Sequence, residues 1–218
     1  DLYDFGPLRA LRNLKVLDIE NTPVEDISPL RGMSLTILNM SRTRVSDLKP
    51  LAGMPLIRLT CSATPVTDFA PSAGAPLMML VVENTQFRDL TVLRGLPLEI
   101  LALGGCNEAR GFAALGKMKL LNTLILPEKI LELPYEELRA IEALRSHPTL
   151  TQIQMSMGRG LVSVDNASVK ERFWTAIETD LALRKVLFEM SGGKGNFQRE
   201  SDGTWTVGFR GLPISDLS

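Results

Sequence analysis

The sequence is poor in the residues on which catalytic and metal sites most often depend. Its 218 residues include one histidine, His147, and two cysteines, Cys61 and Cys106. A Ser-His-Asp or Cys-His device would have to use His147, and a zinc site would need more histidine or cysteine than the chain has. Because His147 directly precedes Pro148 where a predicted helix ends, a structural role is favoured for it. We therefore predict that the protein is not an enzyme and holds no metal and no cofactor.

Neither sign of charge is in excess, and no long apolar run is present. The chain has 24 basic and 25 acidic residues and a formal net charge of -1. A surface for nucleic acid or anionic lipid would show a basic excess, and a membrane-spanning helix needs about 20 consecutive apolar residues. Residues 1–4 carry no signal-peptide pattern. We expect neither nucleic acid nor a membrane as a partner of this chain, and the sequence does not assign a compartment.

Apolar residues recur every 21 residues along the first half of the chain. The L-x-L alternation in each unit places its apolar side chains on one face of a β-strand. The Pro-Leu-x-Gly-Met segment that follows predicts a short helical or irregular turn that returns the chain. The main columns are Leu14, Leu35, Leu56, Leu77 and Leu98; Leu17, Leu38, Leu59, Leu80 and Leu101; Ile19, Met40, Cys61, Val82 and Leu103; and Thr22, Thr43, Thr64 and Thr85, with Cys106 next. A sixth, less regular unit follows at Leu121, Leu124 and Leu126.

The unit L-x-x-L-x-L-x-x-T-x-V-x-D-L-x-P-L-x-G-M-P resembles the leucine-rich repeat in its short bacterial form, with threonine where the family usually has asparagine. The resemblance covers residues 1 to about 126 well and extends loosely to about 155. It implies an α/β fold: a right-handed solenoid with a curved parallel sheet on its concave face and short helical or irregular turns on its convex face. Stacking the units gives one continuous core, because no unit can bury its own apolar face.

The chain divides into three predicted parts. Residues 1–155 form the repeat array, and residues 156–203 form a helical and hairpin module that caps it. Residues 204–218 predict the start of a second, truncated array, because residues 207–217 match residues 80–90 with an offset of 127.

The elements outside the regular repeats are predicted from local patterns. A helix is expected over 134–146, with Pro134 early and Pro148 after its end, and a last strand of the array over 150–155. One or two helices are expected over 168–190. Residues 197–199 and 205–207 flank a turn sequence and are predicted to pair as a β-hairpin.

Two features of the sequence point to a larger bacterial parent protein. Residues 4–11 match residues 26–33 with an offset of 22, so the chain is expected to begin inside a unit as well as to end inside one. Uncapped strand edges invite pairing with another chain, so end-to-end self-association is expected. Residues 145–150 and 173–174 also resemble the inter-array segment of bacterial proteins that combine a serine/threonine kinase domain with such repeats, although this chain has no kinase motif.

The aspartates of the repeat and the two cysteines could in principle bind metal or form a disulfide, but a structural role is predicted for both. The aspartates of the repeat are expected to accept backbone N–H groups in Asx-type turns rather than to bind metal. Cys61 and Cys106 stand two strand spacings apart, about 9.6 Å, which exceeds the roughly 7 Å that a disulfide allows. Both are predicted to be buried free thiols. The aspartates are Asp4, Asp26, Asp47, Asp68 and Asp89.

The strand residues that lie between the buried positions are expected to face outward on the concave sheet. This face is polar in its first units and apolar further along the chain. A large exposed apolar patch marks an interface or is covered by another part of the protein, and residues 168–190 are the segment that could cover it, so both alternatives stay open. The predicted binding residues are Arg58, Met79, Val81, Glu83, Ile100, Ala102 and Ile125.

These features predict a non-catalytic scaffold that binds a protein or peptide of unknown identity. The first alternative is a purely structural spacer between two arrays. The second is an enzyme with an unrecognised site in residues 156–218, which a single histidine and the absence of a catalytic motif disfavour.

Overall fold

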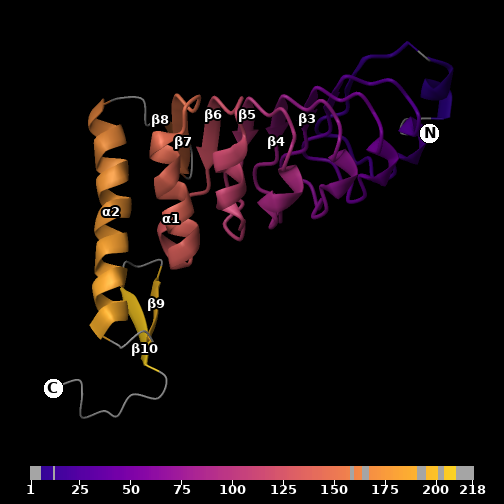
Figure 1. The fold of residues 1–218 in the computed structure, drawn as a ribbon. Coiled ribbons are helices and arrows are strands. Elements are labelled where there is room, and N and C mark those ends of the chain that lie inside the picture. Colours follow the sequence, from indigo (N-terminus) through magenta and orange to yellow (C-terminus); the bar gives the residue numbers. More distant parts are fainter. Residues whose placement is uncertain are drawn as a thin grey trace.

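Each repeat contributes one short strand to a single open sheet (Figure 1). The computed structural model describes residues 6–11, 13–157, 160–163, 167–190, 195–200 and 204–209. Within them, β1 to β7 lie in chain order and run parallel, and β8 is antiparallel to β7. The predicted leucine-rich-repeat solenoid is therefore confirmed. The strands are β1 (Val16–Asp18), β2 (Ile37–Asn39), β3 (Arg58–Thr60), β4 (Met79–Val81), β5 (Ile100–Ala102), β6 (Thr123–Leu126), β7 (Gln152–Met157) and β8 (Gly160–Ser163).

One ladder of leucines runs through the middle of this sheet. Leu17, Leu38, Leu59, Leu80 and Leu101 pair directly across neighbouring strands, as the repeat predicted. The last four are each at most 1% exposed. The prediction was wrong for Leu17, which is only partly buried, because β1 is the outermost strand of the described sheet.

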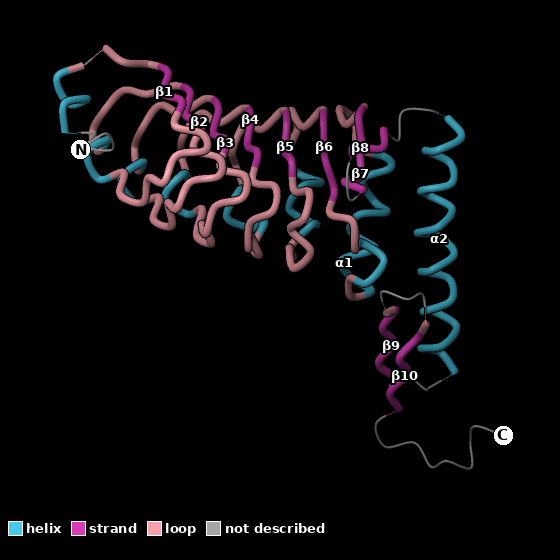
Figure 2. Tube along the Cα trace, turned by 180° about the vertical axis from the view of Figure 1, so that it is seen from behind, coloured by secondary structure: helices cyan, strands magenta, loops and turns pink. Residues whose placement is uncertain are grey.

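Short 3-10 helices return the chain behind the strands (Figure 2). A proline in the first positions of the turns of the first to third regular units fixes one backbone angle in the helical range. The buried residues of these turns close the core on the side away from the sheet. The segments are η1 (Gly6–Ala10), η2 (Ser28–Leu30), η3 (Lys49–Leu51), η4 (Ala70–Ser72), η5 (Leu90–Leu93), η6 (Phe112–Lys117) and η7 (Ile130–Glu132).

A carboxylate starts four of these turns. The Oδ1 atoms of Asp26, Asp47, Asp68 and Asp89 accept the backbone N–H two residues later, at 2.7 to 2.8 Å. The backbone N–H and hydroxyl of Ser28 lower the pKa of Asp26, and Thr91 lowers that of Asp89 in the same way. The predicted Asx-type turn is confirmed for these four aspartates, whereas Asp4 lies outside the described residues.

The next unit starts its turn with a residue from further along the chain. Arg110 stands where the repeat would place an aspartate. Glu137 of helix α1 (Tyr135–Ala143) instead accepts the backbone N–H of Gly111 at 2.9 Å and that of Phe112 at 3.0 Å, where η6 begins. The carboxylate that the unit lacks is thus supplied by α1, and the same contact fixes α1 to the array.

Threonine hydroxyls stabilise the turn that follows each strand. Thr22, Thr43, Thr64 and Thr85 each donate to the carbonyl oxygen three residues earlier at 2.7 Å. These bonds satisfy backbone acceptors inside the solenoid, where water cannot reach them. The threonine column therefore stabilises the turn that follows each of the first four strands.

The residue just before each of these threonines has a left-handed backbone. Asn21, Arg42, Ala63 and Asn84 have φ values of 57°, 57°, 53° and 55°, and Gly105 continues the column at 76°. Asparagine and glycine adopt this conformation readily, whereas an alanine is strained there by about 1–2 kcal/mol. Two of the five positions are therefore occupied by residues that do not suit their backbone.

Replacing Ala63 by glycine is expected to raise the free energy of unfolding by about 0.5–1 kcal/mol, because relief of the strain exceeds the extra chain entropy that glycine loses. Chemical denaturation of both proteins would measure the change. Ala73→Gly is the matched control, since the exposed Ala73 has an ordinary φ of -60° and should be destabilised by the same substitution. A loss of stability in Ala63→Gly would contradict the left-handed turn.

A long helix and a two-stranded sheet follow the array. Helix α2 (Ala167–Met190) packs against α1, and both views place it beyond α1 at the C-terminal end of the solenoid (Figures 1 and 2). Strands β9 (Gly195–Arg199) and β10 (Trp205–Phe209) pair antiparallel. The expected hairpin and helices are confirmed, with α1 continued by η8 (Leu144–Ser146), and the expected last strand of the array is β7. Strand β8 was not predicted.

The second array stays a prediction. The strand that was expected to open it is present as β10, but its partner is β9 rather than a repeat strand. The rest of that unit, residues 210–218, lies outside the described residues.

Candidate functional site

Outward side chains of the middle strands form an apolar patch on the concave face. Met79 and Val81 of β4 pair with Ile100 and Ala102 of β5, and Ile125 of β6 lies next to Ala102. Met79, Val81, Ile100 and Ile125 are each partly exposed. We call these four residues the apolar patch. Their exposure costs free energy in water that binding of an apolar side chain would recover.

Ala102 does not belong to this surface. It was predicted as a binding residue, but it is only 1% exposed. Its methyl group is the smallest side chain in its row, and the register places Val81 on one side of it and Ile125 on the other. The larger neighbours cover it, so Ala102 forms the floor between them.

Helix α2 does not cover the apolar patch. It stands beyond the last repeat and packs against α1 and β9, away from β4 to β6 (Figures 1 and 2). The α2 side chains of Phe173, Trp174 and Ile177 are at most 8% exposed, so the helix has its own packing partners. Of the two alternatives that the sequence left open, the uncovered face is the one present.

Polar residues surround the apolar patch. Arg58, on β3, is exposed, and its strand neighbour Thr60 is partly exposed. On the opposite side, the Thr123 hydroxyl donates to Gln152 Oε1 at 3.2 Å, which carries the polar rim from β6 to β7. A polar rim of this kind is the usual border of a protein interface, where it sets orientation more than affinity.

Glu83 lies at one end of the apolar patch. It follows Met79 and Val81 at the next outward position of the chain, just after β4 ends. Its carboxylate is half-buried, and burial raises the pKa of Glu83 because the charged form loses hydration. No hydrogen bond or ion pair joins this carboxylate to any residue that the structure describes.

Ser62 occupies the same position one strand earlier. Its hydroxyl oxygen is buried and has no hydrogen-bond partner among the described residues. The backbone around it is well paired, since Ser62 N–H donates to Ser41 Oγ at 3.2 Å. The unsatisfied atom is thus the side-chain hydroxyl alone, beside the unpaired carboxylate.

The first strands present a self-contained polar surface instead. The Asn39 side-chain amide donates to Asp18 Oδ2 at 3.3 Å and to Glu20 Oε2 at 3.0 Å. The charged groups there already have partners within the array. This part of the concave face therefore differs from the surroundings of Glu83, where a charged group has none.

A buried ion pair fixes α2 to the last repeat, and sequence reasoning missed it. Arg184 and Asp180 are 2% and 3% exposed, and Arg184 Nε donates to Asp180 Oδ1 at 2.5 Å. Two further nitrogens of Arg184 donate to the carbonyl oxygens of Leu133 and Leu131, each at 2.6 Å. Arg199 of β9 approaches Asp180 Oδ2 at 3.5 Å. One arginine thus joins α2 to the end of η7, and a buried charge that is paired with an opposite charge in this way is a structural contact.

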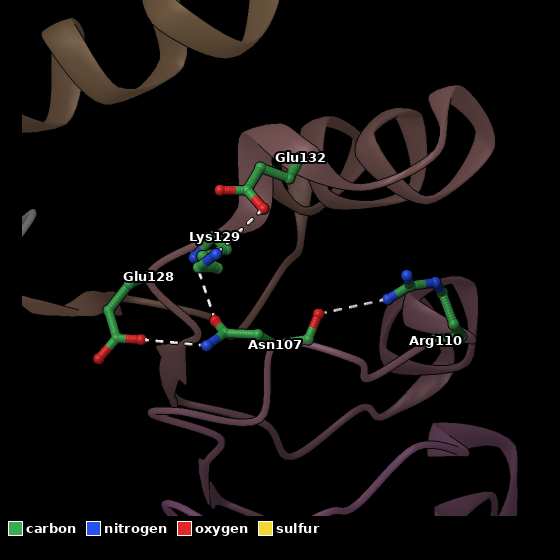
Figure 3. A network of polar contacts seen from close by, with 5 residues as sticks. All are labelled: Asn107, Arg110, Glu128, Lys129 and Glu132. Atoms are coloured by element: carbon green, nitrogen blue, oxygen red, sulfur yellow. Dashed lines mark hydrogen bonds and ion pairs between the residues drawn. The ribbon is translucent and has the colours of Figure 1, made fainter. Parts of the chain in front are cut away.

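Turns of successive units are also linked by a polar network (Figure 3). The Asn107 amide donates to Glu128 Oε2 at 3.4 Å, and its Oδ1 accepts the Lys129 backbone N–H at 3.2 Å. Arg110 donates to the Asn107 carbonyl oxygen at 3.4 Å, and Lys129 pairs with Glu132 at 3.4 Å. Because these groups pair with one another across adjacent turns, the network stabilises the stacking of the units.

The histidine and the two cysteines of the chain occupy structural positions. His147 follows η8, where its Nδ1 lies 3.4 Å from the Thr149 hydroxyl. Cys61 and Cys106 are unbridged and buried, as predicted, and burial raises the pKa of both thiols. The described residues contain no cluster of three or more His, Cys, Asp or Glu side chains able to hold a metal ion. In the same part of the chain, no helix combines the length and the apolar character needed to cross a membrane.

Solved structures with the same architecture are internalins, which are leucine-rich-repeat proteins. An internalin (inlF) from Listeria monocytogenes superposes with a TM-score of 0.60 at 26% identity, over 77% of this chain and 49% of that chain. Internalin C2 (inlC2) from the same organism superposes with a TM-score of 0.56 at 24% identity, over 70% of this chain and 68% of that chain. No protein-family model and no curated protein matches the sequence. The likeness supports the leucine-rich-repeat fold of this chain, which spans about half the length of the first of these internalins.

Proposed function

We propose that the array is a non-catalytic scaffold that binds a protein or peptide segment on its concave face. The observation that carries this proposal is the apolar patch, which faces outward and which α2 leaves uncovered. Arg58 and Glu83 belong to the polar rim of this surface. The internalin-like fold supports the proposal, because the extended concave surface of a solenoid suits recognition.

Panning a displayed library of random peptides on the whole chain tests the proposal. The peptides recovered are expected to bind Val81→Asp at least tenfold more weakly, because a charge at the centre of the patch must lose water when the peptide covers it. Titration of a labelled peptide against both proteins would measure the loss.

Val16→Asp is the matched control. Val16 is 54% exposed on β1, at an outward position of the same sheet but three strands away from β4. The same substitution there should leave peptide binding unchanged. Equal binding to Val81→Asp and wild type would place the binding surface elsewhere.

We also propose that residues 156–203 form a capping module and that residues 204–218 open a second array. The position of α2 against the last repeat supports the first part, and the match of residues 207–217 to residues 80–90 supports the second. A spacer between two arrays is the alternative function, and it predicts no peptide sensitive to Val81→Asp.

The exposed edge of β1 supports end-to-end self-association, and the resemblance of residues 145–150 and 173–174 supports a larger, kinase-linked bacterial parent.

A further inference from the structure

Ser62 and Glu83 are direct neighbours at one end of the apolar patch. The parallel ladder continues past the strands to their row, since Ala63 N–H donates to the Glu83 carbonyl oxygen at 2.8 Å and Asn84 N–H to that of Gly104 at 2.7 Å. Ser62, Glu83 and Gly104 therefore lie side by side on adjacent units. Glu83 is two residues from Val81, which places their Cα atoms roughly 6.6 Å apart along the chain.

The two side chains share an unmet need for a partner. The Ser62 hydroxyl oxygen is buried without a hydrogen bond within the described part of the chain, and the half-buried Glu83 carboxylate has no donor or cation there. Burial raises the pKa of Glu83, which reflects the same loss of hydration. Buried polar groups of native proteins are normally paired, so an unpaired, half-buried carboxylate beside an open apolar surface is suited to a ligand that supplies donors.

The charged residues of the concave face indicate the sign of the charge that such a ligand carries. The acidic side chains of the outward positions are Asp18, Glu20 and Glu83, and the basic one is Arg58. Arg58 begins β3, at the end of the patch opposite Glu83. Asp18 and Glu20 already accept hydrogen bonds from Asn39. Glu83 is thus the acidic group that has no partner on this face within the described residues, and a cationic group complements it.

We infer that the segment bound on the apolar patch places a basic side chain against the Glu83 carboxylate, with an aliphatic side chain of the same segment on the patch. This inference rests on the proposed function. Arginine fits better than lysine, because its planar fork of N–H donors binds a carboxylate through two parallel bonds. The distance from Val81 to Glu83 sets the two ligand side chains about two residues apart in an extended segment.

The peptides that lose binding on Val81→Asp provide the test. They are expected to carry arginine, or less often lysine, within about two positions of an aliphatic residue. In a titration with one such synthetic peptide, Glu83→Gln should weaken binding roughly 10- to 100-fold, as the loss of a charge-assisted hydrogen bond does. Ser62→Ala should leave binding nearly unchanged, because the Ser62 hydroxyl oxygen is buried and out of reach of a ligand on this face.

Glu20→Gln is the matched control, since it removes the same charge from the same row three units away, and it should leave affinity unchanged. Replacing the peptide's arginine with citrulline, its neutral analogue, should abolish the difference between Glu83→Gln and wild type. Thermal unfolding of each variant checks that it is folded. Two results would overturn the inference and leave the proposed function standing. One is that the peptides sensitive to Val81→Asp carry no basic residue, and the other is that Glu83→Gln and Glu20→Gln lose the same amount of peptide affinity. Finding no peptide sensitive to Val81→Asp would overturn both.

Discussion

Truncating Leu59 to alanine is expected to lower the free energy of unfolding by about 2–5 kcal/mol. Leu59 is 0% exposed and pairs with Leu38 on one side and Leu80 on the other. The substitution removes buried apolar surface and leaves a cavity that its neighbours cannot fill without disturbing the ladder. Each unit of a solenoid is stabilised by its contacts with its neighbours. A cavity at Leu59 therefore weakens the contacts between the units before β3 and the units after it.

Urea denaturation followed by circular dichroism would measure this loss. Leu120→Ala is the matched control, since Leu120 is 52% exposed and its truncation should change stability by no more than about 0.5 kcal/mol. A loss well under 1 kcal/mol for Leu59→Ala would contradict the register of the repeat, and so would equal losses for the two variants.

Replacing Arg184 with alanine is expected to weaken the docking of α2 by about 3–5 kcal/mol, as removal of one partner from a buried ion pair does. The substitution leaves Asp180 buried with only Arg199, at 3.5 Å, and withdraws the donors from the carbonyl oxygens of Leu131 and Leu133. The ion pair between Arg145 and Glu178 also joins α2 to the array, but both side chains are nearly half exposed and stabilise the contact little.

Hydrogen exchange of the α2 amides would report the loss directly, because α2 should open while the array stays folded. Lys185→Ala is the control on the next residue, whose exposed side chain lies 4.0 Å from Glu189. It should leave α2 protected. Wild-type protection of α2 in Arg184→Ala would show that the helix is held by its apolar contacts alone.

The parts of the fold that follow from the repeat were predictable from the sequence. A strict spacing of 21 residues specifies which leucines pair, and the side-chain period of a strand then decides which residues face outward. The role of the aspartate column followed from the same alignment, because each aspartate acts within its own unit. The left-handed backbone of one column could also have been predicted, because asparagine or glycine occupies it at Asn21, Asn84 and Gly105. No such prediction was made from the sequence.

The remaining features depend on contacts between residues far apart in the sequence. Glu137 takes the place of the missing aspartate, although it lies 26 residues after Gly111, whose N–H group it accepts. Arg184 donates to carbonyl oxygens that lie 51 and 53 residues earlier in the chain. No local pattern encodes such partners. The burial of Ala102 depends in turn on the size of the side chains on two adjacent strands, so its outward position alone did not predict its exposure.

One measurement tests most directly whether the concave face is an open binding surface. It is the free energy of unfolding of Val81→Asp, determined on the same preparation that is used for the peptide titration. An open face predicts that binding is lost while stability falls by no more than about 1 kcal/mol, because an outward strand position tolerates a polar residue. A protein that unfolds, or loses several kcal/mol as a newly buried charge demands, would show that Val81 is covered in solution and that the apolar patch is an internal contact.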